Sequence, residues 1–105
     1  MNVKVLAHDA SENLTSEWYR MHEDNFAIEI ECAGLDALDA EVHLEYGFDI
    51  SATAGIEIQD SRQTLDAADK HIGIRNASAL NAEWIRFVYT KGANTVGTIN
   101  FRGNV

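Results

Sequence analysis

Alternation of apolar and polar residues is the sequence feature that most constrains this fold. It is clearest in residues 26–32 (FAIEIEC) and 41–48 (EVHLEYGF). Because successive side chains of a strand point to opposite faces, each segment predicts a strand with one buried face. The expected inward sets are Phe26, Ile28, Ile30 and Cys32, and Val42, Leu44, Tyr46 and Phe48. The expected outward sets are Glu29 and Glu31, and Glu41, His43 and Glu45.

Weaker alternation elsewhere predicts further strands, which gives about eight short strands in all. These segments are Val3–Ala7, Glu17–His22, Ile56–Ile58, Ile72–Ile74, Glu83–Thr90 and Thr95–Arg102. Spacings of ~8–12 residues are typical of an antiparallel sandwich or barrel. We expect Lys91–Asn94 to form a hairpin loop between the last two strands, and residues 33–40 to contain at most one helical turn.

The length of the chain fits one domain. It has 105 residues, of which 46% are hydrophobic, enough to build a single core. We therefore expect residues 1–105 to form one all-β domain. Residues 1–15 have a second interpretation, as an extended N-terminal arm.

The charge balance excludes several classes of partner. Eight Lys and Arg stand against 17 Asp and Glu, a formal charge of −9. Nucleic-acid binding depends largely on basic side chains, so neither nucleic acid nor an anionic membrane is an expected partner. No stretch approaches the ~18 apolar residues of a membrane-spanning helix, and a single Cys cannot form an internal disulfide. The N-terminus lacks a secretory signal pattern, so we expect a soluble protein made in the cytosol.

Much of the negative charge falls on the outward faces of the two clearest strands. If these strands pair as antiparallel neighbours, Glu29, Glu31, Glu41 and Glu45 share one exterior face. Such a face either keeps the protein soluble and blocks sheet stacking, or attaches a basic partner. The sequence leaves both interpretations open.

No catalytic, cofactor or metal site is predicted. Phosphate loops, metalloprotease motifs and nucleophile elbows are all missing from the sequence. Cys32 lies on an apolar strand face and is expected to be an inert buried thiol. The possible ligands His22-Glu23-Asp24, His43 and Glu45 fall short of a zinc pattern unless they converge. Convergence of His22, His43 and Glu45 in one cleft would favour a small β-barrel enzyme instead.

Two aromatic and basic segments are candidates for an interface. Trp18-Tyr19-Arg20 and Trp84-Ile85-Arg86 each place a Trp and an Arg on the same side of a strand. These residue types are enriched at binding hot spots, so Trp18, Tyr19, Arg20, Trp84 and Arg86 are the candidate interface residues. The alternative is that Arg stacks over Trp simply to cover the flank of the sandwich.

The C-terminal half resembles small virion proteins of tailed bacteriophages. In these, an aromatic-Ile/Val-Arg-apolar strand precedes a Thr-Lys-Gly/Asn turn and then Gly-Thr-Ile/Val, as in residues 79–100 (ALNAEWIRFVYTKGANTVGTIN). Residues 40–45 and 60–66 are similar to other parts of the family. Residues 46–51 (YGFDIS) stand where family members often carry Ser-x-Asp-Gly-x-x-Trp. The similarity spans about residues 25–103.

This resemblance implies a jelly-roll β-sandwich without enzymatic activity. The implied function is a capsid cement or decoration protein that bridges capsomers on the outside of the head, made in the host cytoplasm. The implied partners are the major capsid protein or another virion protein, with a homotrimer as the favoured oligomer. The alternative is a tail or fibre module whose Trp18, Tyr19 or Trp84 stacks on a host carbohydrate or receptor.

Overall fold

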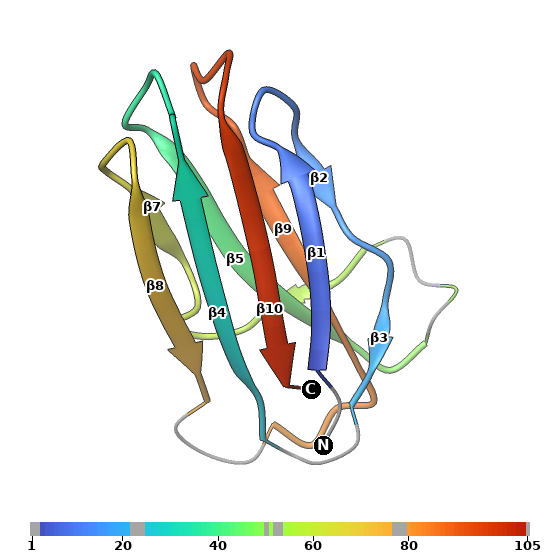
Figure 1. Cartoon of the computed structure of the whole chain (residues 1–105). Coiled ribbons are helices and arrows are strands. Elements are labelled where there is room, and N and C mark those ends of the chain that lie inside the picture. The colour runs from blue at the N-terminus through green and yellow to red at the C-terminus, as the bar shows by residue number, and fades with distance from the viewer. Residues whose placement is uncertain (1–2, 22–24, 50, 52–53, 77–79, 105) are drawn as a thin grey trace.

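The alternating segments do form strands. The computed structural model describes residues 3–21, 25–49, 51, 54–76 and 80–104, and these residues contain ten strands and no helix (Figure 1). The strands are β1 (Val3–Asp9), β2 (Leu14–Thr15), β3 (Tyr19–Arg20), β4 (Ala27–Ala33), β5 (Ala40–Gly47), β6 (Ile56–Glu57), β7 (Gln63–Leu65), β8 (Lys70–Arg75), β9 (Trp84–Thr90) and β10 (Thr98–Asn104).

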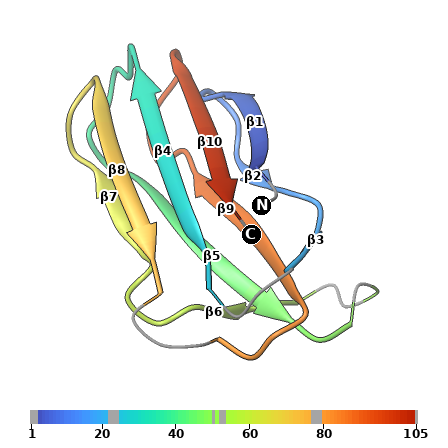
Figure 2. The ribbon, with the colours of Figure 1, turned by 60° about the horizontal axis from the view of Figure 1, so that its bottom comes forward.

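The strands form two antiparallel sheets that pack face to face (Figure 2). Sheet A has the order β1-β10-β4-β8, and sheet B has the order β2-β9-β5-β6, with β3 also pairing with β9 and β7 with β5. If β2 with β3, and β6 with β7, each count as one interrupted strand, eight strands remain in two sheets of four. Their order is that of a jelly roll. The chain is therefore an all-β, single-domain antiparallel β-sandwich, as the sequence predicts.

The core lies between the sheets and uses the alternate residues expected to face inward. Phe87 of β9 stacks on Phe101 of β10 with ring centroids 5.1 Å apart and nearly parallel planes. The hydroxyl of Tyr89 donates a 2.8 Å hydrogen bond to the carbonyl of Ala10, so even this buried phenol is satisfied. Burial raises the pKa of Tyr89 to about 12, so the phenol keeps its proton well above neutral pH.

The strands at both edges of sheet B are interrupted, each at a buried serine, and the two interruptions lie at the same level of the sheet. The amide of Phe87 donates to the Ser16 hydroxyl (2.9 Å), and the amide of Leu44 donates to the Ser61 hydroxyl (3.1 Å). Phe87 and Leu44 are directly opposite each other in the β5–β9 pair. In each case a side-chain oxygen satisfies an amide where the edge strand turns aside, so the interruption leaves no unpaired donor there.

The two clearest strands do not pair with each other, so the condition for a shared acidic face is not met. β4 lies in sheet A between β10 and β8, whereas β5 lies in sheet B beside β9. Residues 34–39 therefore cross from one sheet to the other and contain no helical turn. Lys91–Asn94 does form a turn, with a 3.1 Å bond from the Asn94 amide to the Lys91 carbonyl. It also crosses between sheets, so it is not a hairpin loop.

Other differences are local. Phe48 was expected to face inward. However, β5 ends at Gly47, and Phe48 lies beyond the strand and is exposed. His43 faces outward but is buried there. The strand expected at Glu17–His22 is reduced to β3, and His22 lies outside the described residues. β1 pairs with β10 along its whole length, so residues 3–9 belong to sheet A and do not form a separate arm.

We expect Gly97→Ala to destabilise the protein by roughly 2–3 kcal/mol. Gly97 has a φ of 106°, and an added Cβ would lie 2.8 Å from the Ala33 carbonyl oxygen. Gly73→Ala is the control, because a Cβ there would meet nothing nearer than 4.0 Å. Urea denaturation should show a large loss for Gly97→Ala and almost none for Gly73→Ala. Equal effects would show that the positive φ and the close packing at Gly97 do not require glycine.

Candidate functional site

The outer face of sheet B carries a mostly buried ionic cluster centred on Glu45 of β5. One carboxylate oxygen of Glu45 accepts hydrogen bonds from Arg86 Nε (2.8 Å) and lies 2.7 Å from Arg86 Nη2. The other oxygen lies 2.9 Å from His43 Nε2. Strand register explains this convergence, since Arg86 on β9 is directly opposite Glu45 and His43 is two residues away on the same face.

Trp18 covers this ionic cluster from the segment between β2 and β3. The guanidinium of Arg86 lies 4.3 Å from the centre of the Trp18 ring. The edge of the indole reaches Gly47 and Gly55, where an added Cβ would lie 3.1 Å and 2.9 Å from Trp18 Cη2. The two glycines thus leave room for the ring. The stack shields the cluster, which strengthens its electrostatic interactions.

The net effect of this environment is a lowered pKa for the Glu45 carboxyl. Burial alone would raise that pKa, but the hydrogen bonds from His43 and Arg86 outweigh it. Glu45 therefore stays ionised and anchors both neighbours at neutral pH.

A second Arg–Trp pair lies on the same face nearer the edge. Arg20 of β3 is opposite Trp84 of β9, and its guanidinium lies 6.0 Å from the Trp84 ring centre. Arg20 also forms a loose ion pair with Glu83 at 3.9 Å, and both side chains are exposed. Each Arg thus stacks on the Trp of the other segment, a crossed pairing that the sequence does not reveal.

The five candidate interface residues therefore differ in accessibility. Arg86 is buried and Trp18 is half-buried against it. Tyr19 turns toward the core, where its ring lies 5.4 Å from that of Phe87. Arg20 is exposed, and Trp84 is half-buried beside it. Trp18 and Arg86 therefore fit the alternative interpretation, in which Arg stacks on Trp to cover the sheet. Arg20 and Trp84 remain accessible to a partner.

The four glutamates expected on one exterior face lie on opposite sides of the molecule. Glu41 and Glu45 are on sheet B, whereas Glu29 and Glu31 are on sheet A, because β4 and β5 belong to different sheets. On sheet B, Arg62 binds both Glu41, at 3.0 Å, and Glu57. Cation pairing thus offsets most of the like-charge repulsion that a row of glutamates would cause.

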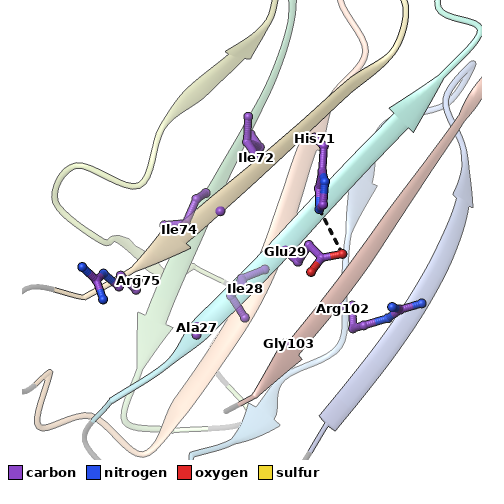
Figure 3. A pocket seen from close by; sticks show the side chains of 10 residues that line it. Ala27, Ile28, Glu29, His71, Ile72, Ile74, Arg75, Arg102 and Gly103 are labelled. Atoms are coloured by element: carbon purple, nitrogen blue, oxygen red, sulfur yellow. Dashed lines mark ion pairs between the residues drawn. The ribbon is translucent and has the colours of Figure 1, made fainter.

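The outer face of sheet A brings together three possible metal ligands that the sequence search did not name. One ligand atom each from Glu29, Glu31 and His71 lie within 4.8 Å of one another. His71 Nε2 is 3.0 Å from a Glu29 oxygen, beside a shallow hollow of about 630 Å³ (Figure 3). All three side chains are exposed. The ion pair between His71 and Glu29 is by itself enough to explain why these two side chains lie together. Only the β4–β8 register, which places His71 opposite Glu31, reveals this group.

The possible ligands and thiol named from the sequence do not form a site among the described residues. His43 and Glu45 are bound to each other and to Arg86, while His22, Glu23 and Asp24 lie outside the described part of the chain. Cys32 is buried in the core, and burial raises the pKa of its thiol. That environment is typical of an unreactive structural cysteine.

No protein-family model matches the chain, and no curated protein is significantly similar to it. Within the described ranges, no helix is long and apolar enough to span a membrane.

We expect Arg86→Met to cost about 3 kcal/mol of stability, because it leaves the Glu45 carboxylate buried without its cation. Arg62→Met is the matched control. Its side chain is 46% exposed against 11% for Arg86, so losing its ion pairs should cost about 1 kcal/mol or less. Chemical denaturation of the two variants would compare them. Equal costs would show that the ionic cluster is not effectively buried.

The lowered pKa of Glu45 predicts a pH dependence. The folded protein holds the ionised carboxylate more favourably than the unfolded chain, whose Glu has a pKa near 4.5. The stabilisation is thus complete above that value and lost as the pH falls through the lower folded pKa. The difference in unfolding free energy between wild type and Glu45→Gln should shrink as the pH falls below 4.5. Urea titrations above and below this pH measure it, and a pH-independent difference would contradict the assignment.

Proposed function

We propose that this chain is a non-enzymatic structural protein of a bacteriophage virion, a decoration protein that binds the outside of the head and bridges neighbouring capsomers. The observation that carries the proposal is the jelly-roll strand order. Jelly rolls are widely used in viral capsid and lectin domains. The resemblance of residues 79–100 to small virion proteins adds to it, and this stretch includes all of β9 and the crossing to β10.

A small sandwich of this kind is suited to a mechanical role. The ion pairs of Glu45 with Arg86, and of Arg62 with its two glutamates, restrain the outer face of sheet B before any partner binds. Preorganised side chains lose little conformational entropy on binding. A protein that binds only the assembled lattice then stabilises that lattice by mass action.

The proposed partner is the major capsid protein or another virion protein, with three copies of this chain associating as a trimer. The charge of −9 suits the exterior of the head, away from packaged DNA. Among the candidate interface residues, Arg20 and Trp84 are the accessible pair, because Trp18 and Arg86 are engaged with each other.

A tail or fibre module that binds host carbohydrate is the second candidate function. Trp84 supports it, since its indole is half-exposed and the Arg20 guanidinium, 6.0 Å from its ring centre, is itself exposed. Trp18 and Tyr19 support it less, because Arg86 covers one face of Trp18 and Tyr19 packs near Phe87. The decoration role is therefore the better supported of the two. A glycan array would reveal sugar binding that depends on Trp84.

Quantitative mass spectrometry of purified particles, from the phage that encodes this chain, tests the proposal. A decoration protein should be present in hundreds of copies per particle, because it binds repeating lattice sites. About a dozen copies would instead favour the tail or fibre module. Absence from the particle would contradict both virion roles.

A further inference from the structure

One end of the sandwich is formed by four loops that bond directly to one another. They comprise residues 9–13, 34–39, 66–69 and 91–97, and are called the loop end below (top of Figure 1). The Asn13 side chain accepts from the Lys91 amide (2.8 Å), and the Asp69 side chain accepts from the Gly34 amide (2.9 Å). These bonds join segments that are far apart in the sequence, so the loop end is a preorganised surface.

The two central loops are the most tightly joined. Asp36 accepts from the amide of Thr95 at 2.8 Å and from its hydroxyl. The Asn94 side chain accepts from the Ala37 amide at 2.9 Å, and Asp39 accepts from the Ala93 amide at 3.1 Å. These bonds hold residues 36–39 and 93–95 side by side.

Each of these joined loops exposes one large aliphatic side chain. Leu38 is 57% exposed and Val96 is 52% exposed. Each lies within two residues of a bond that joins the loops, so both side chains belong to the loop end. Exposed apolar groups on a rigid scaffold are typical of interaction sites.

Charge identifies the kind of partner. The loop end contains six acidic residues and one lysine: Asp9, Glu12, Asp36, Asp39, Asp66, Asp69 and Lys91. Lys70, directly after it, pairs with Asp66, and the balance stays acidic. The hydrogen bonds from Thr95 also hold the pKa of Asp36 below its usual value, so that carboxylate stays charged. Two copies of this end would repel each other, and nucleic acid or an anionic membrane would be repelled in the same way. The complementary surface is basic around an apolar hollow.

We propose that the loop end is the surface that docks on the capsid, with Leu38 and Val96 entering an apolar hollow of a shell protein whose rim is basic. This inference rests on the proposed decoration function and specifies which part of the chain makes the contact. The aliphatic side chains provide affinity, while the aspartates speed the encounter and set its orientation.

The chain offers a matched pair of variants to test the apolar contact. Phe48 and Ile56, at the opposite end, are 60% and 54% exposed, close to the values for Leu38 and Val96. Binding would be measured on particles of the encoding phage prepared without this gene, by co-sedimentation. Leu38→Ser with Val96→Ser should weaken binding at least tenfold, whereas Phe48→Ser with Ile56→Ser should change it less than twofold. Unchanged unfolding midpoints would show that both variants fold.

A second pair of variants tests the charges. Asp36→Asn, Asp39→Asn and Asp69→Asn together remove three charges but keep the acceptor oxygens that bind the neighbouring amides. Glu29→Gln, Glu31→Gln and Asp49→Asn remove the same charge elsewhere. At low salt, the first triple variant should associate about tenfold more slowly, with a flatter salt dependence, and the second should approach the wild-type rate.

The outcomes separate this inference from the function on which it rests. If wild type binds particles but only the Phe48 and Ile56 variant is impaired, or neither is, docking through the loop end is overturned and the decoration role stands. If wild type does not bind, the decoration role fails and the inference fails with it. Self-association of the free protein that depends on Leu38 and Val96 would show that a second copy occupies the surface instead, which also overturns the inference.

Discussion

The stack of Phe87 on Phe101 joins the central strands of the two sheets. β9 pairs with β2, β3 and β5, and β10 pairs with β1 and β4. Five strands are therefore linked directly to the two strands that this contact connects. Both rings are fully buried, and Tyr19 packs near one of them. Burial of two aromatic rings in van der Waals contact fixes the spacing of the sheets, and the other inward side chains fill the space around them.

The faces of the strands could be predicted from the sequence, but their neighbours could not. Period-two alternation shows which side chains are buried, so the inward residues of β4, and Val42 and Leu44 of β5, are as expected. It carries no information about which strand lies beside which, because an apolar face packs equally well in either sheet. For that reason the pairing of residues 26–32 with 41–48 could only be a condition, and it is not met, so the four glutamates do not share a face.

The sequence indicated which residues belong to the candidate site, but not how they pair with one another. Trp and Arg on one side of each segment indicated stacking, yet the crossed pairing depends on the register of β3 with β9. His43 was expected to be solvated because its strand position is outward, but Trp18 and Arg86 lie over that part of the face. The loop end was missed altogether, since Asp36 and Thr95 are 59 residues apart and only the completed fold brings them together.

The interruptions at Ser16 and Ser61 bear on whether a strand of another chain can add to the edges of sheet B. A continuous edge strand is a template for another chain, and both edges of sheet B are broken at the Phe87–Leu44 row. Of the edges of sheet A, β8 begins with Lys70 and ends with Arg75. Antiparallel pairing of two such strands would set these cations against each other. Three of the four sheet edges thus resist strand addition, so a crowded array of these molecules would remain discrete subunits instead of fusing into fibrils.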